Sequence, residues 1–250
     1  PVALLPADHF IPDADLFRGQ LQTAFDLAAA KQTVITIGVR PTHPETGYGY
    51  IRTEGQAHEA GDLDGQEFVE KPDAVRAEEY VRSGQFYWNS GIFIWNPLWF
   101  SNMAQQHVPE IVRLMEPAIK EFGTNGFEAA LESAYSQCPA ESVDVAIMEK
   151  LPGFSLLEAN FRWSDLGSWN AWGELAEELN QGNRGIGDLL AIESTGNVVR
   201  SEGRLVALLG VDDLIVVDTP DALLVTRKTH AQRIKEIINH LESDGRDDLL

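Results

Sequence analysis

The chain has 250 residues, 44% of them hydrophobic, and a formal net charge of −20 from 39 acidic and 19 basic side chains. That content can bury the core of one large α/β domain, or of a large and a small one. The acidity argues against a DNA- or RNA-binding module, because it would repel nucleic-acid phosphates. It indicates a solvated acidic surface, although adaptation to high salt would give the same composition.

Cysteine content and hydropathy bear on the kinds of site the chain can form and on its cellular location. Cys138 is the single cysteine, so the sequence offers neither an internal disulfide nor a cysteine-based zinc site. No apolar run approaches the roughly 20 residues that a membrane span needs. We therefore expect a cytoplasmic protein with no membrane partner and no nucleic-acid partner.

The start of the chain is typical of an α/β sheet. Residues 2–5 are apolar and predict a buried strand, residues 15–31 carry an apolar helical face, and residues 33–39 predict a second buried strand. Strand, helix and strand in this order predict a βαβ crossover and a parallel sheet. The loop at 41–49 then lies at the carboxyl end of a strand, where ligands bind in open α/β sheets.

Further elements are expected along the rest of the chain. They are strands at 50–53 and 67–70, an aromatic-rich segment at 86–95, and helices at 73–83, 97–122 with a break at Pro109, 127–136, 143–150 and 168–179. After Gln181 short β-rich runs separated by Gly or Asp suit a small β-helix or a meander, and residues 234–241 predict a terminal helix. We place the domain boundary so that one domain is 1–182 and the other 183–250.

Two aspartates stand where apolar segments give way to turns. Asp8 directly follows the first predicted strand, and Asp165 lies between Trp163 and a Leu-Gly-Ser turn. Carboxylate oxygens suit Mg²⁺, which usually takes one or two carboxylates plus phosphate oxygens. Each aspartate can equally be a turn or capping residue, and the spacing does not show that the two meet.

A second group of residues suggests a sugar phosphate. Lys71 is followed by proline, which should bias it to extended backbone and aim its ammonium group out of the strand end. A phosphate is a natural partner there, and a surface pair with Glu70 is the alternative. Gly49 lies in a Gly-rich turn that would let a ligand approach the backbone closely. Asn89 stands among aromatic residues and could hydrogen-bond sugar hydroxyls.

A series of motifs follows along the chain in a specific order. They are Pro6-Ala-Asp-His9, Gly47-Tyr-Gly-Tyr-Ile51, Phe68-Val-Glu-Lys-Pro72, Trp88-Asn-Ser-Gly-Ile-Phe93, Ser142-Val-Asp-Val-Ala-Ile-Met-Glu149 and Trp163-Ser-Asp-Leu-Gly-Ser-Trp169. Together they closely resemble the mannose-1-phosphate guanylyltransferase family of sugar nucleotidyltransferases. The resemblance implies a Rossmann-like α/β domain, incomplete at its N-terminus, followed by a small left-handed β-helix-like domain and a C-terminal helix.

The resemblance also implies a reaction and roles for particular residues. GMP would pass from GTP to α-D-mannose 1-phosphate, giving GDP-mannose and pyrophosphate, by in-line attack without a covalent enzyme intermediate. Asp8 and Asp165 would bind Mg²⁺ and, with Lys71 on the sugar phosphate, form the catalytic set. The residues that would bind the mannose 1-phosphate are Gly49, Glu70, Lys71 and Asn89.

The chain departs from the family at its start. The family opens with a Gly-rich loop that contains basic residues, and nothing like it precedes Asp8. We therefore expect the carboxyl-terminal part of a longer protein, inactive as a transferase in the form of this chain alone. The alternatives are another sugar-1-phosphate nucleotidyltransferase and a non-catalytic regulatory subunit that binds sugar nucleotides. The β-rich tail offers a contact surface for a homodimer.

Overall fold

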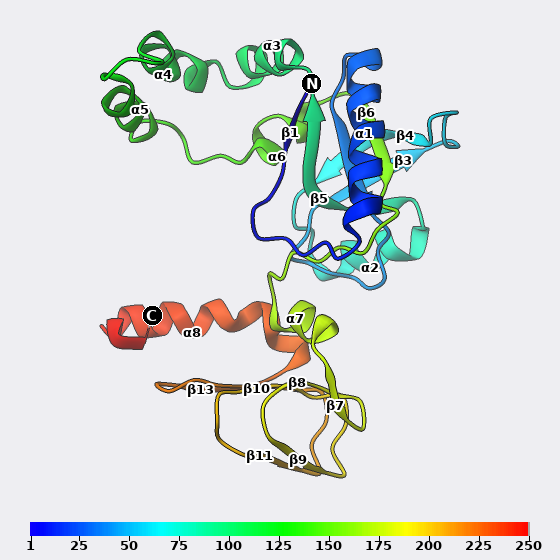
Figure 1. Cartoon of the computed structure of the whole chain (residues 1–250), viewed down its shortest axis with the longest axis vertical. Helices are drawn as coiled ribbons and strands as arrows, with labels where there is room; N and C mark the ends of the chain where they lie inside the picture. The colour runs from blue at the N-terminus through cyan, green and yellow to red at the C-terminus, as the bar shows by residue number, and fades with distance from the viewer. Residues whose placement is uncertain (250) are drawn as a thin grey trace. The chain divides into compact units, whose positions relative to one another are not determined.

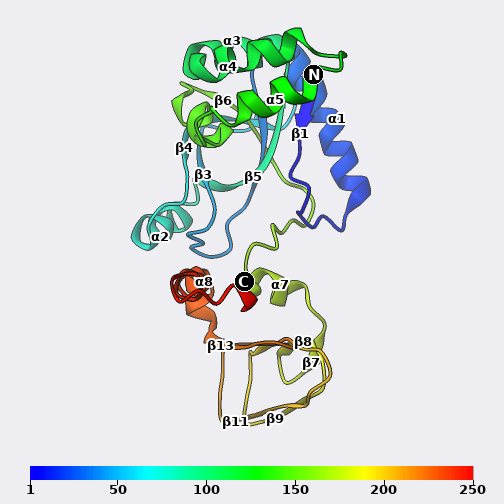
Figure 2. The same ribbon diagram turned by 90° about the vertical axis from the view of Figure 1, so that its left-hand side faces the viewer.

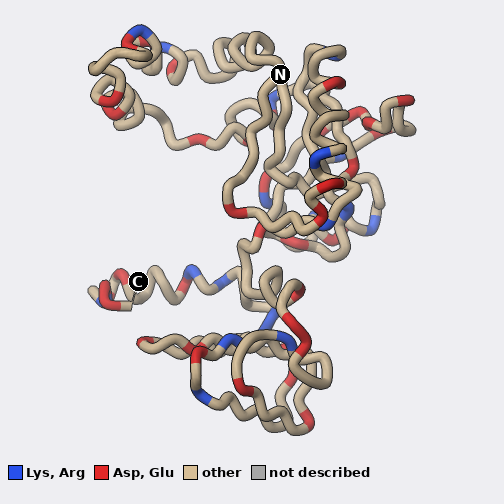
Figure 3. Tube along the Cα trace, in the orientation of Figure 1, with Lys and Arg blue, Asp and Glu red and all other residues tan. Residues whose placement is uncertain are grey.

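The computed structural model describes residues 1–249, which form two compact units. The first unit consists of residues 1–7 and 11–163, and the second of residues 8–10 and the chain from Ser164 onward. Figures 1 and 2 show the elements of each unit, and Figure 3 shows the positions of acidic residues along the backbone of both. No helix within residues 1–249 is long and apolar enough to cross a bilayer. The domain boundary at 182 stays a prediction.

The first unit is built on a six-stranded sheet with the order β1-β5-β2-β6-β4-β3. The strands are β1 (Val2–Leu4), β2 (Ile35–Val39), β3 (Tyr50–Glu54), β4 (Asp62–Val69), β5 (Phe86–Trp95) and β6 (Phe154–Glu158). β2 and β6 are parallel, and the other pairs of this sheet are antiparallel. The sheet is therefore mixed, and the parallel sheet expected from the sequence is corrected. β1 and β2 do run in the same direction, but β5 lies between them.

β1 is exposed at the edge of this sheet, contrary to the prediction of a buried strand. It pairs with β5 on one side, and its Val2 and Leu4 side chains are 47% and 46% exposed. A short apolar run predicts a strand but not the number of its neighbours. The existence of the strand was predicted correctly, and its burial was wrong.

The helices of the first unit follow the predicted order. They are α1 (Ala14–Lys31), α2 (Ala74–Ser83), α3 (Pro97–His107), α4 (Pro109–Lys120), α5 (Phe127–Tyr135), the short α6 (Val143–Ala146) and the 3₁₀ turn η1 (Met148–Lys150). α1 runs beside β5 and buries Ala24, Leu27 and Ala28 (Figure 1). Pro109 begins α4, where its missing N–H costs nothing, so the predicted helix at 97–122 is two helices.

The second unit winds short strands into a β-helix-like domain. Its elements are α7 (Trp169–Leu175), β7 (Glu178–Asn180), β8 (Asn183–Ile186), β9 (Leu189–Ile192), β10 (Val198–Ser201), β11 (Val206–Leu209), β12 (Leu214–Asp218), β13 (Leu223–Arg227), η2 (Lys228–Arg233), α8 (Ile234–Ser243) and η3 (Asp247–Leu249). β8, β10 and β12 stack in parallel, as do β9 and β11. The two stacks face each other in Figure 1, and Val199, Leu208 and Val216 are buried as one cluster.

Two buried asparagines link successive coils of this domain. Asn183 and Asn197 are both fully buried. Asn183 Oδ1 accepts hydrogen bonds from the backbone N–H and the side-chain Nδ2 of Asn197, each at 2.9 Å. Asn197 Oδ1 accepts one from the backbone N–H of Leu214, also at 2.9 Å. Because a buried amide without partners costs about 1–3 kcal/mol, these bonds hold the coils in register.

Candidate functional site

Gly49, Glu70 and Asn89 lie in one row across the sheet of the first unit. Gly49 precedes β3, Glu70 follows β4, and Asn89 lies within β5; the register of β3 with both other strands places the three side by side. The backbone N–H of Asn89 donates to the carbonyl oxygen of Gly49 at 2.8 Å. A Cβ on Gly49 would lie 2.7 Å from Glu70 Oε2. The structure thus brings together three of the residues predicted to bind the sugar.

Hydrogen bonds at both ends fix the side-chain amide of Asn89. Its Oδ1 accepts from the backbone N–H of Gly91 at 3.0 Å, and its Nδ2 donates to Asp144 Oδ1 at 2.9 Å. The two partners require the same orientation, because an N–H needs the amide oxygen and a carboxylate needs the amide nitrogen. One N–H and one oxygen lone pair of the amide remain for a ligand.

Lys71 directly follows Glu70 in the turn between β4 and α2. Its Nζ lies 3.1 Å from Glu70 Oε1, with the lysine side chain 62% exposed and the glutamate side chain 23% exposed. Lys71 has a φ of +46°, so the extended backbone predicted from the following proline is wrong. The chain reverses here to enter α2, which Asp73 caps. Non-glycine residues held in this region cost about 1–3 kcal/mol and cluster at functional sites.

Glu45 orders the loop that leads to Gly49. Its Oε1 accepts from the backbone N–H of Gly47 at 2.8 Å, and its Oε2 lies 3.6 Å from His43 Nε2. Burial alone would raise the pKa of Glu45, but the bonds with His43 and Gly47 outweigh it and lower that pKa. Glu45 therefore stays ionised and holds the Gly-rich turn in place.

Aromatic rings join the same loop to its neighbours. The Tyr48 ring packs edge-to-face on Trp88 at 5.2 Å and on Trp163 at 5.4 Å between centroids. Trp88 directly precedes Asn89. Edge-to-face pairs contribute about 0.5–1.5 kcal/mol beyond the area they bury. The loop is thus packed against Trp88 of β5, the residue before Asn89.

Asp8 and Asp165 lie on adjoining backbone segments of the second unit. The backbone N–H groups of Phe10 and Ser164 donate to each other's carbonyl oxygens, at 2.8 and 3.1 Å, in an antiparallel bridge. Asp8 is two residues before Phe10, and Asp165 directly follows Ser164. The Asp8 carboxylate is 86% exposed, and Asp165 Oδ1 accepts from the backbone N–H of Gly167 at 3.0 Å.

These two carboxylates fit a hard, largely hydrated cation. Mg²⁺ is usually held by one or two carboxylates, and water or substrate phosphate oxygens complete its shell. Within the described residues no group of three or more His, Cys, Asp or Glu side chains is arranged as a metal cage. The bridge therefore joins two segments that each carry a carboxylate, at Asp8 and Asp165, and carboxylate oxygens are donors of the kind that Mg²⁺ takes.

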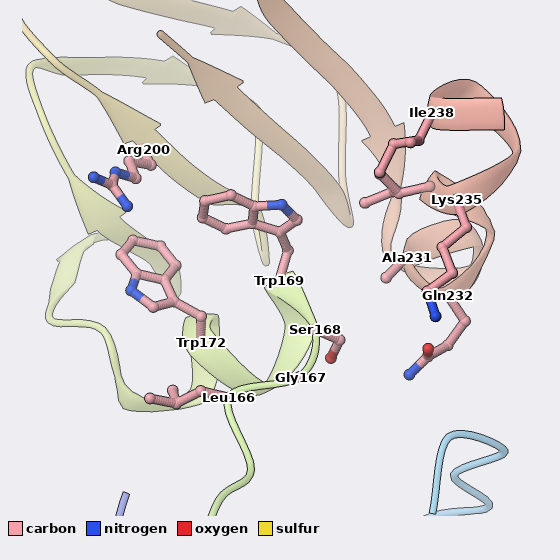
Figure 4. Close-up of a pocket in the computed structure, with 11 residues that line it drawn as sticks. Leu166, Gly167, Ser168, Trp169, Trp172, Arg200, Ala231, Gln232, Lys235 and Ile238 are labelled. Atoms are coloured by element: carbon pink, nitrogen blue, oxygen red, sulfur yellow. The ribbon is translucent and has the colours of Figure 1, made fainter. Parts of the chain in front are cut away.

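A pocket of about 310 Å³ lies beside the turn that follows Asp165 (Figure 4). Its walls include the rings of Trp169 and Trp172, packed edge-to-face at 5.5 Å, and the side chains of Lys235 and Ile238. None of the residues predicted to act on substrate lines it. The predicted site residues therefore lie outside this pocket, in the row of the first unit and next to the bridge of the second unit.

The sequence did not single out three acidic residues that contact this row or order its loop. They are Glu45, Asp144 and Glu149. Glu149 Oε1 accepts from the backbone N–H of Glu70 at 3.0 Å, and Asp144 binds Asn89 as described. Asp144 and Glu149 belong to the motif at 142–149, where acidic residues flank buried apolar ones; that alternation was an available signal.

Comparison with known proteins identifies the family. The Nucleotidyl transferase family matches residues 1–182, and the family described as MannoseP isomerase/GMP-like beta-helix domain matches residues 187–241. The chain belongs to the nucleotidyl transferase family. The match confirms the predicted fold, an α/β nucleotidyl transferase domain followed by a β-helix-like domain with a terminal helix.

The chain has curated relatives in several bacteria. The mannose-1-phosphate guanylyltransferase of Escherichia coli K12 is 36% identical over 97% of this chain and 52% of the relative. The alginate biosynthesis protein AlgA of Pseudomonas aeruginosa is 35% identical over 97% of this chain and 51% of its own length. The chain spans about half the length of the curated relatives it matches.

A solved structure shows the same architecture. The crystal structure described as a mannose-1-phosphate geranyltransferase from Thermus thermophilus aligns with a TM-score of 0.82 at 33% identity. The alignment covers 96% of this nucleotidyl transferase chain and 69% of the other chain. The resemblance predicted from the ordered motifs is confirmed, while the roles of individual residues stay predictions.

Proposed function

We propose that the protein transfers GMP from GTP to α-D-mannose 1-phosphate, giving GDP-mannose and pyrophosphate, with Mg²⁺ as cofactor. The proposal rests mainly on one observation, the row of Gly49, Glu70 and Asn89 beside Lys71. That row occurs in a chain whose relatives include mannose-1-phosphate guanylyltransferases.

The row would bind the sugar through complementary groups. The Glu70 carboxylate accepts hydrogen bonds from hydroxyls, while Asn89 has one N–H and one lone pair to offer. Gly49 has no side chain, so a ligand can approach its backbone closely. These groups would orient the sugar but carry out no bond-making step.

Lys71 would bind the phosphate of the sugar. In a chain of net charge −20, an anionic substrate needs a local cation, and Lys71 is an exposed one next to the row. Its ammonium group would exchange the Glu70 carboxylate for phosphate oxygens, acting as a point charge. This aims a phosphate oxygen for in-line attack on the α-phosphorus of GTP, from which pyrophosphate leaves.

Asp8 and Asp165 would hold Mg²⁺. When bound, the ion would neutralise charge on the phosphates of both substrates. The contribution of the chain is to present these two carboxylates on segments joined by the backbone bridge between Phe10 and Ser164. No nucleophilic side chain is required, because positioning and charge neutralisation account for such transfers.

Binding tests the sugar half of this proposal. Isothermal titration of the 250-residue chain with mannose 1-phosphate should show saturable binding, and N89A and K71A should weaken it at least tenfold. Glucose 1-phosphate, which differs only in the 2-hydroxyl orientation, is the control ligand. Absence of mannose 1-phosphate binding would refute the assignment.

Turnover tests the whole reaction. The gene product expressed from its own reading frame should form GDP-mannose from GTP, mannose 1-phosphate and Mg²⁺, and should prefer GTP to ATP, UTP and dTTP. A different preferred base or sugar would favour another sugar-1-phosphate nucleotidyltransferase. Binding of sugar nucleotides without turnover would favour the regulatory subunit.

The cytoplasmic location and the homodimer belong to the same proposal. The exposed side chains of Leu190, Ile192 and Leu209 on β9 and β11 supply apolar surface for an interface between two copies. Sedimentation velocity across a range of protein concentrations measures the oligomeric state. A monomer at all concentrations would contradict the homodimer.

A further inference from the structure

One short segment reaches two of the predicted sugar-binding positions. This segment, which we call the α6–η1 segment, covers residues 142–150. Asp144 Oδ1 accepts from Asn89 Nδ2 at 2.9 Å, and Glu149 Oε1 accepts from the backbone N–H of Glu70 at 3.0 Å. The two contacts lie at opposite ends of the segment and reach different strands, β5 and the end of β4.

Between these carboxylates the α6–η1 segment is anchored in the core. Ala146, Ile147 and Met148 are 4%, 3% and 1% exposed and belong to the same buried cluster as Phe68. Ser142 caps the segment by accepting from the backbone N–H of Val145. Packed side chains resist displacement, so both carboxylates are presented from a fixed base.

Each carboxylate fixes one feature of the row. Asp144, together with the backbone N–H of Gly91, favours the orientation of the Asn89 amide in which one N–H binds Asp144 and the other remains for a ligand. Glu149 satisfies the first backbone N–H after β4, at the turn that carries the Glu70 carboxylate and the left-handed Lys71. Removing that acceptor would release a strained turn.

We infer that Asp144 and Glu149 are positioning residues of the sugar-phosphate site, acting through Asn89 and Glu70 and not on the substrate itself. This inference rests on the proposed function for its ligand, mannose 1-phosphate. Positioning requires a hydrogen-bond acceptor but no negative charge. The amide oxygens of D144N and E149Q should therefore preserve it, whereas D144A and E149A abolish it.

Nuclear magnetic resonance of the ligand-free chain tests the positioning directly. In D144A the side-chain amide signals of Asn89 should shift and exchange with solvent about tenfold faster, and in E149A the Glu70 amide should exchange about fivefold faster. D144N and E149Q should stay close to wild type. E141A, which removes an exposed carboxylate just outside the segment, is the matched control and should change neither signal.

Titration with mannose 1-phosphate tests the consequence for binding. The dissociation constant should rise about tenfold in D144A and about fivefold in E149A, and stay within about twofold of wild type in D144N, E149Q and E141A. If D144N or E149Q binds as poorly as its alanine counterpart, the charge itself acts and positioning is refuted. Unchanged binding and unchanged amide signals in D144A and E149A would also overturn it.

The two measurements separate this inference from the proposed function. If the wild-type chain binds no mannose 1-phosphate, the sugar assignment fails, and so does positioning for that ligand. The amide signals then still decide whether Asp144 and Glu149 hold Asn89 and Glu70. A general loss of folding would appear as a lowered melting temperature, which the conservative variants should not show.

Discussion

The carboxylate of Glu70 occupies the space that a side chain on Gly49 would need. Glu70 Oε2 lies 2.7 Å from the ideal Cβ position, closer than real Cβ contacts allow. The φ of Gly49 lies outside the left-handed region, so the backbone itself would accept alanine. What excludes alanine is the end of a flexible side chain that is predicted to bind substrate.

G49A should therefore impair binding more than stability. The methyl group would push the Glu70 carboxylate aside, which costs about 1 kcal/mol or less in unfolding free energy but should raise the dissociation constant for mannose 1-phosphate at least tenfold. Titration calorimetry and urea unfolding measure the two effects. G19A, in α1 with nothing within 4 Å of the added methyl, is the control and should gain about 0.5–1 kcal/mol of stability. If G49A bound mannose 1-phosphate as tightly as wild type, the position of the Glu70 carboxylate would not matter for binding.

In the gene product expressed from its own reading frame, D165N should lower GDP-mannose formation at least a hundredfold with little change in stability. The substitution keeps an oxygen for the backbone N–H of Gly167 but removes the charge proposed to hold Mg²⁺. Steady-state rates as a function of Mg²⁺ concentration measure the effect. D188N, at an exposed acidic residue of the same unit, is the matched control. Wild-type rates in D165N would remove Asp165 from the site.

Tyr87 should titrate at unusually high pH. Burial, together with the hydrogen bond that its hydroxyl donates to Glu158 Oε2 at 2.9 Å, raises the pKa of Tyr87 to about 12. An unfolded tyrosine titrates near about 10. The unfolded state therefore loses this proton first, and the contribution of Tyr87 to stability is complete below about pH 10 and lost as pH rises towards about 12.

Ultraviolet absorbance of the phenolate checks this pH dependence. Y87F should remove a transition near pH 12 and flatten the fall of unfolding free energy above about pH 10. Y135F, which alters an exposed tyrosine, should leave both features in place. If Y87F kept the absorbance transition at that high pH, the transition would belong to a tyrosine other than Tyr87.

G185A should destabilise the β-helix-like domain by more than about 3 kcal/mol. A Cβ on Gly185 would lie 1.7 Å from the carbonyl oxygen of Val199, and the φ of +149° disfavours any side chain. The obstacle is backbone of the neighbouring coil, which cannot rotate away. Chemical unfolding measures the loss, and G153A, whose methyl would meet only an ordinary contact at 3.6 Å, is the control.

The order of elements was predictable because hydrophobic periodicity and turn residues are local signals. The strand predicted at 50–53 is β3 at Tyr50–Glu54, and the break predicted at Pro109 is the start of α4. Neighbour relations were not predictable in the same way. The apolar residues 2–4 form an edge strand because they pair on one side only, with β5. That strand comes much later in the chain, so the local sequence does not reveal the pairing.

The site was predictable where chemistry followed a motif and unpredictable where it depended on pairing. Gly49, Glu70 and Asn89 come together because their strands share a register, which sequence spacing alone does not reveal. The left-handed backbone of Lys71 was missed because a following proline disfavours the right-handed helical region but does not choose between the alternatives. Asp144 and Glu149 were missed because acidic residues in short helices are usually solvated.

The hydrogen bonds between the buried asparagines of the β-helix-like domain limit where this part of the chain can gain or lose residues. Asn183 and Asn197 meet because the chain between them makes one turn of the coil and returns each amide to the same radial position. Inserting a single codon between them would leave buried amides facing apolar neighbours. Corners open to solvent, such as the exposed pair at 202–203, carry no such amide and can absorb insertions that leave the contact between Arg204 and Asp218 in place. Alignments of this domain should therefore show length variation at its corners and a constant spacing between the positions of Asn183 and Asn197.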